Sequence, residues 1–259
     1  MQLLQYDIDK QVRAFSTIRG EGSGNYGGFN ITHYCGDDPQ HVAECREELC
    51  RYLSIDNSRL ILPRQTHGSE VHCIDEAFTA LTESEQQTLL HGIDAIVTSL
   101  HRVCIGVSTA DCIPILLYDT KKEVVAAIHA GWRGTVARIT DRCIGTMKER
   151  YGSTCSDIRA VIAPGISIEA FEVGNEVLEE FTKAGFLAED IATLYPSAEG
   201  EKWHIDLWKA NHLQLTQAGV PQENIQTAGI CTYKECDKFF SARRLGINSG
   251  RIFNGIMIL

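Results

Sequence analysis

The chain has 259 residues, of which 44% are hydrophobic, and a formal net charge of −10. This length and composition suffice for a sizeable core in one large domain or two small ones. The negative charge argues against a nucleic-acid or anionic-membrane surface. No run of eighteen apolar residues predicts a transmembrane helix, and the first residues lack a signal-peptide pattern. We therefore expect a cytoplasmic protein with neither nucleic-acid nor membrane partners.

The ten cysteines are spread along the chain, and no two of them form a Cys-x-x-Cys pair. In a chain of this length without a leader pattern, such cysteines indicate reduced thiols, and the missing pair argues against a structural zinc knuckle. Several are expected to pack as small apolar residues, among them Cys45, Cys50, Cys143 and Cys155.

The first half of the chain predicts short strands and helices separated by polar or glycine-rich turns. In order these are a strand opening the stretch 12–32, a helix over 39–54, a strand, turn and strand over 60–75, a short helix or loop over 79–91 and a strand over 93–99. Asp38-Pro39 supports the start of the first helix. Five glycines in nine positions, 20–28, leave two interpretations open: close backbone approach to a ligand, or an exposed flexible loop.

The strongest local pattern is a predicted β-hairpin in the middle of the chain. Two apolar runs, Ile113–Tyr118 and Val124–His129, lie on either side of the polar break Asp119-Thr120-Lys121-Lys122 and Glu123, and a break of four residues is a common length for a hairpin loop. If Tyr118 pairs with Glu123, the antiparallel register places Cys112 directly opposite His129, with Cβ atoms about 4.5–5.5 Å apart. A thiolate and an imidazole at that spacing can share one metal ion or one proton.

The register is the weak step, because Pro114 favours a bulge or an edge position, and a bulge would shift the pairing by one residue.

The second half predicts helices and strands around one surface loop. In order these are a helix over 136–151 capped by Thr135 and ended by Gly152, a strand over 158–163, a helix over 172–184, a variable surface loop over 186–202, a helix over 205–218, a strand over 225–231 and a C-terminal strand. No composition shift, repeat or low-complexity tract divides the chain. We therefore predict a single domain of mixed α and β structure, an α+β fold over residues 1–259.

His67, Cys112 and His129 are candidate metal ligands, because each lies beside residues that force a backbone turn. Two histidines and one cysteine match the ligand count of a catalytic zinc with an open fourth position, and the same donors also admit copper. Two alternatives stay open. His129 and Cys112 could be ordinary buried side chains, or Cys112 could be a nucleophile activated by His129, with Asp111 or Asp94 orienting the imidazole. The last interpretation predicts a thiol hydrolase or deamidase.

Several arginines lie next to glycine, proline or serine in turn-like contexts: Arg19, Arg64, Arg133, Arg243 and Arg251. Converging guanidinium groups would bind phosphate or carboxylate bidentately and overcome the negative net charge locally. Ordinary surface ion pairs are the competing interpretation for Arg64 and Arg244.

Long motifs along nearly the whole chain are similar to those of one known family. They are Phe15-Ser16-Thr17, Gln65-x-His67-Gly68, Asp94-Ala95, Thr109-Ala110-Asp111-Cys112-x-Pro114, His129-Ala130-Gly131-Trp132-Arg133-Gly134, Ala163-Pro164-Gly165-Ile166 and Phe240-Ser241-x-Arg243-Arg244. On these residues the chain resembles the YfiH-like family, also named the laccase-domain or multicopper polyphenol oxidase family.

The resemblance implies a single α+β domain with layered α-β-β-α order and mixed sheets, related to a toxin deamidase fold. It implies a metal held by the positions that are His67, Cys112 and His129 in this chain. The activities that it implies conflict: copper polyphenol oxidation, zinc-dependent purine nucleoside phosphorolysis (including methylthioadenosine) with adenosine deamination, and removal of wrong amino acids from peptidoglycan precursors.

Physical chemistry favours one of these activities. A copper oxidase of this kind needs several coppers and His-x-His pairs, whereas this chain has nine histidines and no such pair. One mixed His/Cys site with an open position suits Lewis-acid chemistry, and zinc deaminases activate water with a comparable set of ligands. Their glutamate acid/base has no obvious match here, so Asp111 is our candidate for that role.

We therefore expect a zinc enzyme, with copper as the alternative metal, that acts on purine nucleosides by phosphorolysis and deamination. Cys112, His129 and Asp111 would form the catalytic centre, and Arg133 with Arg243 would hold phosphate. Arg19 is a third candidate for the anion, although relatives carry arginine directly after Phe-Ser-Thr, where this chain has Ile18.

Three other classes stay open: a cysteine hydrolase or amidase, a copper polyphenol oxidase, and a non-catalytic metal-binding protein. We expect small-molecule partners and a monomer or homodimer.

Overall fold

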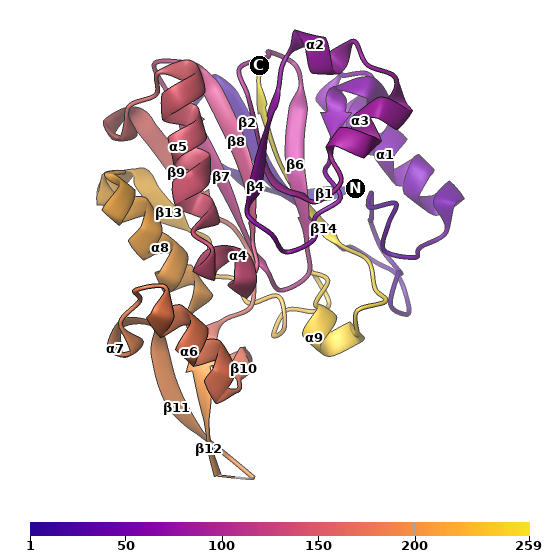
Figure 1. The fold of residues 1–259 in the computed structure, drawn as a ribbon. Coiled ribbons are helices and arrows are strands. Elements are labelled where there is room, and N and C mark those ends of the chain that lie inside the picture. The colour runs from indigo at the N-terminus through magenta and orange to yellow at the C-terminus, as the bar shows by residue number, and fades with distance from the viewer. Residues whose placement is uncertain (199) are drawn as a thin grey trace.

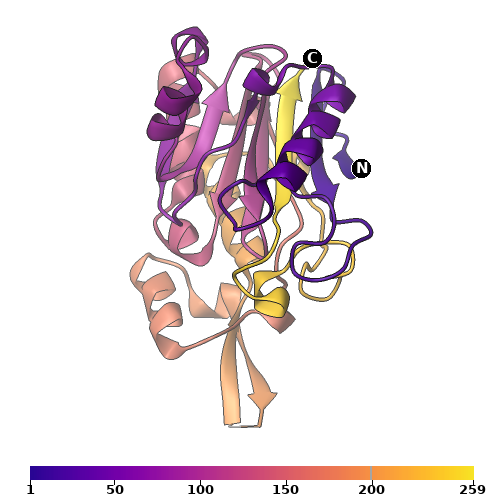
Figure 2. The same cartoon turned by 90° about the vertical axis from the view of Figure 1, so that its right-hand side faces the viewer.

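Two large β-sheets lie face to face, with helices covering their outer faces (Figures 1 and 2). The computed structural model describes residues 1–198 and 200–259. In spatial order, the first sheet contains β1 (Gln2–Tyr6), β2 (Val12–Ile18), β14 (Ile252–Ile258), β6 (Cys104–Thr109) and β3 (Leu60–Ile61). The second contains β13 (Ile225–Thr227), β9 (Ile158–Ile162), β7 (Ile113–Asp119), β8 (Val124–Ala130), β5 (Ile93–Thr98) and β4 (Glu70–Ile74).

The helices complete an α-β-β-α order, which confirms the expected fold class. Helix α1 (Pro39–Leu53) packs Cys45, Leu49 and Leu53 against the first sheet. On the second sheet lie α5 (Ile139–Tyr151) and α8 (Leu207–Ala218). A small third sheet, with the order β10 (Glu172–Val173), β12 (Gly200–Ile205) and β11 (Ala192–Ser197), extends from one end of the molecule (Figure 1).

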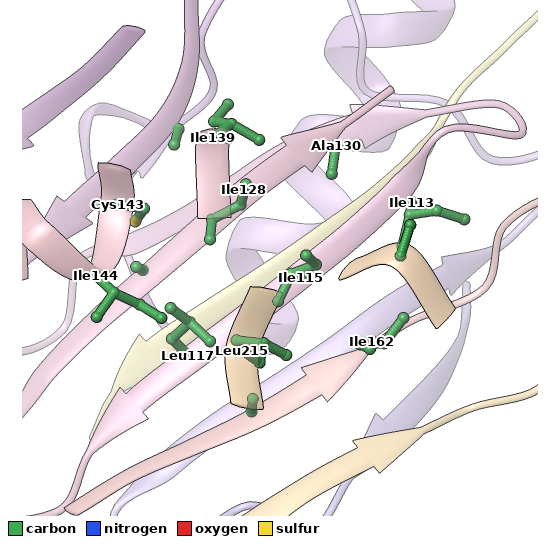
Figure 3. Close-up of a cluster of buried hydrophobic side chains, with 14 of the residues drawn as sticks. Ile113, Ile115, Leu117, Ile128, Ala130, Ile139, Cys143, Ile144, Ile162 and Leu215 are labelled. Carbon is green, nitrogen blue, oxygen red and sulfur yellow. The ribbon is translucent and has the colours of Figure 1, made fainter. Parts of the chain in front are cut away.

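The hairpin of β7 and β8 lies at the centre of the second sheet and is buried on both faces. Because side chains alternate along a strand, Ile115 and Leu117 face the layer of α5 and α8, while Leu116 faces the other sheet. Figure 3 shows the first of these layers, where Ile128 and Ile139 also pack. Each such aliphatic side chain contributes about 1.5–3 kcal/mol on burial.

The hairpin itself is confirmed, but the expected register is wrong by two residues. Tyr118 pairs with Val125 and not with Glu123. The loop has the expected four residues but covers 120–123, where the N–H of Glu123 bonds to the carbonyl of Asp119 at 3.0 Å and Glu123 adopts a φ of 52°. A shift of two residues preserves the alternation of side chains, so it leaves every residue on the face that the sequence predicted.

Pro114 lies in a central strand and not at an edge. It pairs with His129 in β8, and its carbonyl accepts a hydrogen bond of 2.9 Å from Ala163, where β9 has already ended. The missing N–H of Pro114 therefore falls beyond the last paired residue of β9, Ile162.

Most other expected elements are present, including β2, α1, β5, β9, α8 and β14. The region 79–91 contains α3 (Glu83–Leu89), preceded by α2 (Glu76–Thr79). The expected helix over 136–151 is instead two helices, α4 (Trp132–Val136) and α5, because Arg138 between them has a φ of 60°. Thr135 does not cap a helix; its hydroxyl donates to the carbonyl of Gly131 within α4.

Two expectations in the third quarter of the chain are wrong. Residues 172–184 begin with the short strand β10, and the helix α6 (Asn175–Lys183) starts only afterwards. The expected surface loop over 186–202 contains α7 (Ala188–Ile191) and the strands β11 and β12, while residue 199 lies outside the described residues. Across residues 1–198 and 200–259, none of the helices has the length and apolar character that crossing a membrane requires.

Candidate metal centre

Three segments that are distant in sequence meet at one end of the layer between the two large sheets. His67 lies in the loop between β3 and β4, Cys112 in the turn between β6 and β7, and His129 on β8. One ligand atom from each residue lies within 4.8 Å of the other two, and the two imidazole centroids are 4.9 Å apart. His129 is buried, Cys112 is half-buried and His67 is exposed, so the group opens toward solvent on the His67 side.

The buried carboxylate of Asp94 organises two of these three residues. Its Oδ1 atom lies 2.7 Å from Nδ1 of His129 and accepts a hydrogen bond of 3.0 Å from the backbone N–H of His67. Its Oδ2 atom accepts from the N–H groups of Gly68 and Thr66, at 2.8 and 3.2 Å. The carboxylate thus holds the loop in which His67 has a φ of 64°. Because Asp94 contacts Nδ1 of His129, the other ring nitrogen, Nε2, remains as the candidate metal-binding atom of His129.

The strand register explains why Asp94 is in the right place. Ala95 of β5 pairs with Ile128 of β8, so the next pair along the ladder is Asp94 and His129, on the same face. Asp94 was named at the sequence level only as one of two residues that could orient the imidazole. Its strand pairing is what identifies it.

The electrostatics of the group favour a thiolate next to an imidazolium. Burial alone would raise the pKa of Cys112, but the adjacent imidazoles of His129 and His67 outweigh it and lower that pKa to about 6. Burial would lower the pKa of His129, but the Cys112 thiolate and the Asp94 carboxylate raise it to about 9. For Asp94, burial acts to raise the pKa, and the contacts with His129 and the backbone N–H groups more than offset this and lower it.

Gly131 lies in close contact with the candidate ligands. A Cβ atom there would lie 3.0 Å from Sγ of Cys112 and 3.0 Å from Cδ2 of His67. A side chain at position 131 would therefore require Cys112 or His67 to shift by a few tenths of an ångström. Donor type and open geometry fit a zinc ion, whose catalytic sites keep three protein ligands and one exchangeable position.

A cavity of about 580 Å³ lies over the three residues. Its wall combines the aromatic side chains of Tyr34, Trp132 and Phe171 with polar groups. Gln65, of the Gln-x-His-Gly motif, bonds to the backbone N–H and carbonyl of Ser108 and accepts a hydrogen bond from the Tyr34 hydroxyl. Volume and lining suit a ligand of nucleoside size.

The sequence analysis did not name Tyr34, Gln65, Trp132 or Phe171 as site residues. The Gln-x-His-Gly and Gly-Trp-Arg-Gly motifs were the available signals for Gln65 and Trp132, whereas nothing local marks Tyr34 or Phe171.

The structure separates the candidate arginines. Arg243, on the short helix α9 (Ala242–Leu245), lines the cavity. Arg251 lines it too, but its guanidinium donates to the carbonyls of the 247–250 loop. Arg133 is exposed, with its guanidinium 4.2 Å from the centroid of the Trp132 ring, and it is not a lining residue of this cavity.

Arg19 lies away from the cavity and braces the glycine-rich loop. Its guanidinium donates to the carbonyls of Gly27, Cys236 and Gly24 at 2.8, 2.9 and 2.6 Å. The loop is thereby held against the segment around Cys236, which favours a structural role for Arg19 over anion binding.

Asp111 lines the cavity, but its carboxylate is already bonded on both oxygens. Oδ1 accepts from the hydroxyl of Thr232 and Oδ2 from the backbone N–H of Arg243, each at 2.7 Å. Because both oxygens already accept hydrogen bonds, Asp111 holds neighbouring segments together and is less suited to act as a general base.

Similar proteins carry the same architecture. A structure of YfiH from Bacillus licheniformis, 27% identical, superimposes with a TM-score of 0.89 over 99% of this chain and 96% of that chain. The structure of YlmD from Geobacillus stearothermophilus, also 27% identical, gives a TM-score of 0.88 over 100% of this chain and 96% of that chain.

Two sequence relatives are nearer. "Adenosine deaminase RL5", from an unknown prokaryotic organism, is 48% identical over 261 residues, which cover 99% of this chain and 98% of the relative. "Purine nucleoside phosphorylase" of Bacteroides thetaiotaomicron is 45% identical over 246 residues, covering 94% of this chain and 90% of the relative. The model of the family described as "Multi-copper polyphenol oxidoreductase laccase" matches residues 12–259. The chain therefore belongs to this laccase-like family, together with YfiH and its structural neighbours.

Proposed function

We propose that the protein is a zinc-dependent purine nucleoside phosphorylase that also deaminates adenosine. The observation that carries the proposal is the group of His67, Cys112 and His129 at the floor of a nucleoside-sized cavity. The names of the two nearer relatives supply the two reactions. Adenosine, inosine and methylthioadenosine are the proposed substrates, with phosphate as the second reactant. We place the enzyme in the cytoplasm as a monomer or homodimer.

Cys112 and the two histidines would hold the metal, because they offer one thiolate and two imidazoles with an open side toward the cavity. When bound, zinc supplies Lewis-acid polarisation of an oxygen or activation of water. Asp94 fixes the His129 ring so that Nε2 faces the group. His129 is buried and His67 is exposed, so the open side of the group faces the cavity.

The remaining wall suits the two parts of the substrate. Trp132 and Phe171 offer apolar aromatic surface on which a purine base can pack. Arg243 presents a guanidinium to the same cavity, and such a group binds phosphate oxygens in a bidentate manner. Arg133, the other arginine expected to hold phosphate, is not among the residues that line this cavity.

We propose zinc in preference to copper because the described part of the chain offers one candidate metal site, whereas a multicopper oxidase needs several. A multicopper oxidase needs several copper centres rich in histidine. Among residues 1–198 and 200–259, the structure contains one group of three or more such donors within ligand distance. Copper stays the alternative metal for that one group, with polyphenol oxidation as the corresponding activity.

Substrate profiling of metal-defined protein tests the proposal. Protein loaded with zinc should release purine base from inosine and adenosine only when phosphate is added, and should release ammonia from adenosine without phosphate. Apo-protein should do neither. Turnover of phenolic substrates by the copper-loaded protein, without nucleoside turnover by the zinc-loaded protein, would reject the proposal in favour of the oxidase.

One observation favours a second candidate, a cysteine hydrolase or amidase acting, for example, on peptidoglycan precursors. Asp94, His129 and Cys112 form a chain of contacts like a catalytic triad. The imidazole of His129 contacts both the Asp94 carboxylate and the Cys112 thiol. This candidate requires a metal-free thiolate. It predicts highest activity in chelated protein, the opposite of the zinc proposal.

A further inference from the structure

Asp111 lies directly before Cys112 and joins several segments of the cavity wall. Its φ is 87°, a left-handed conformation that glycine, asparagine and aspartate adopt more readily than other residues. Its carbonyl oxygen accepts a hydrogen bond of 2.8 Å from the N–H of Ile166, another lining residue. The backbone next to Cys112 is therefore fixed against the loop that follows β9.

The side chain of Asp111 fixes two more segments. The hydroxyl that contacts Oδ1 belongs to Thr232, which is fully buried and whose own N–H bonds to the carbonyl of Gly165 at 3.0 Å. The N–H that contacts Oδ2 belongs to Arg243, in the first turn of α9. A carboxylate accepting from a backbone N–H makes one of the stronger hydrogen bonds in a protein.

Arg243 is thereby held at both ends. Its main chain bonds to Asp111, while Nη2 donates to the carbonyl of Glu172 at 3.2 Å and the guanidinium lies 5.6 Å from the ring centroid of Phe171. In the part of the chain that the structure describes, Nε and Nη1 of Arg243 have no hydrogen-bond partner. These N–H groups remain for an anion in the cavity.

We propose that Asp111 is a positioning residue that fixes the phosphate-binding Arg243 relative to Cys112, and so selects phosphate in place of water as the nucleophile. This inference rests on the proposed function. In phosphorolysis, a phosphate oxygen forms a bond to C1′ of the ribose while the bond from C1′ to the base nitrogen breaks. The base leaves with that electron pair and takes the proton of the hydrogen phosphate. Deamination adds water at C6 of the base and expels ammonia, so it needs no bound phosphate.

The test compares both reactions in zinc-loaded full-length variants. Asp111→Gly removes the carboxylate, and because glycine adopts a φ of 87° without strain, the backbone beside Cys112 is preserved. We expect about one equivalent of zinc and an intact fold. The KM for phosphate with inosine should rise about tenfold or more, the loss expected for one charge-assisted hydrogen bond. Deamination of adenosine should change much less than the KM for phosphate, because water replaces phosphate in that reaction.

Three further variants sharpen the comparison. Asp111→Asn should also raise the KM for phosphate, because its amide NH2 would face either the Thr232 hydroxyl or the Arg243 N–H and lose that hydrogen bond. Thr232→Val removes only one contact and should have a smaller effect. Asp119→Asn, which changes a buried carboxylate at the end of β7, should leave both reactions unchanged.

Three results would overturn the inference: an unchanged KM for phosphate in both Asp111 variants, an equal fall in kcat for both reactions, or loss of zinc from Asp111→Gly. The second would make Asp111 catalytic, and the third would make it a support for Cys112 alone. If the wild type catalyses no phosphorolysis, the proposed function fails separately. Calorimetric titration of inorganic phosphate into zinc-loaded wild type and Asp111→Gly then decides the inference, which requires weaker binding by the variant.

Discussion

Nδ1 of His129 lies 2.7 Å from Oδ1 of Asp94, and both side chains are buried. The same carboxylate holds the backbone of His67, so one residue orients two of the three candidate ligands. In metal sites, a carboxylate behind a histidine fixes the ring and raises its basicity. The pairing also leaves no buried imidazole N–H without an acceptor at this position.

Asp94→Asn should therefore weaken zinc binding without abolishing it. The amide keeps the volume of the carboxylate, but its NH2 must face either the His129 ring or the backbone N–H groups of Gly68 and Thr66. We expect a loss of about 10–100-fold in zinc affinity, the usual effect of removing such a partner. Competition with a chromophoric chelator measures it, and an unchanged affinity would show that Asp94 does not support the site.

Cys112→Ala should remove most of the bound zinc while leaving the apo-protein folded, because Cys112 is only half-buried. Cys143→Ala is the matched control, since Cys143 is fully buried in α5 and is not among the residues that line the cavity. That control should lower the melting temperature through the cavity that it leaves, yet retain zinc. Elemental analysis of both variants checks the prediction, which fails if Cys112→Ala keeps its zinc.

Gly131→Ala should disturb the metal centre by steric contact only, because it changes no donor or charged group. The new methyl group would lie 3.0 Å from Cys112 Sγ and His67 Cδ2, so at least one candidate ligand has to move. Gly145→Ala is the control, because nothing lies within 4 Å of a Cβ at that helical position. We expect lower zinc affinity for the first variant, and for the second unchanged affinity with a free energy of unfolding about 0.5–1 kcal/mol higher. Equal zinc affinity in the two variants would contradict the close approach at Gly131.

The sequence predicts the residues of the metal centre better than it predicts the conformation of the loops around it. The hairpin pattern predicted Cys112 directly opposite His129, and this is wrong, because Pro114 pairs with His129. A shift of two residues still keeps positions 112 and 114 on the same side of the strand, because the side-chain period of a strand is two. The loop that accompanies the observed register contains Glu123 in a left-handed conformation, which glutamate rarely adopts and which the sequence does not predict.

The missed elements share a physical cause. Helix α4 ends at Val136, just before Arg138 with its positive φ, and most residues of the hairpin of β11 and β12 are exposed or half-buried and alternate little in polarity. Neither feature has the apolar periodicity from which helices and strands are recognised. The same holds for β6 (Cys104–Thr109), which is buried on both faces and shows no alternation.

The positions of the two arginine side chains also could not be predicted from the residues next to them in the sequence. Arg133 lies in the more distinctive motif, but α4 directs it outward over the Trp132 ring, whereas Arg243 is directed inward by contacts with Asp111 and Glu172. Such long-range contacts leave no pattern near the arginine itself.

Arg243→Lys should raise the KM for phosphate with a smaller effect on nucleoside binding. A lysine supplies one point charge in place of a planar pair of N–H donors, and the loss of a charged hydrogen bond is worth about 1.5–3 kcal/mol. Arg133→Lys, at an exposed position outside the cavity, is the matched control and should leave the KM unchanged. A larger effect at Arg133 than at Arg243 would move the anion site to the outer face of α4.

Chelation should expose a reactive thiol at Cys112. A thiolate bound to zinc is poorly available for attack, whereas a free thiolate beside imidazoles is a strong nucleophile. We therefore expect iodoacetamide to leave Cys112 of zinc-loaded protein largely unmodified and to alkylate it soon after chelator is added, as read by peptide mass spectrometry. Cys143, buried among apolar side chains with a raised pKa, should stay unlabelled in both states and serves as the internal reference.

The time course of activity separates the two chemistries. If the zinc proposal is correct, phosphorolysis stops on chelation and returns with added zinc, unless Cys112 was alkylated in between. Rapid labelling of Cys112 in fully zinc-loaded protein, or a covalent acyl adduct on its sulfur, would instead assign the Asp94, His129 and Cys112 series to nucleophilic catalysis.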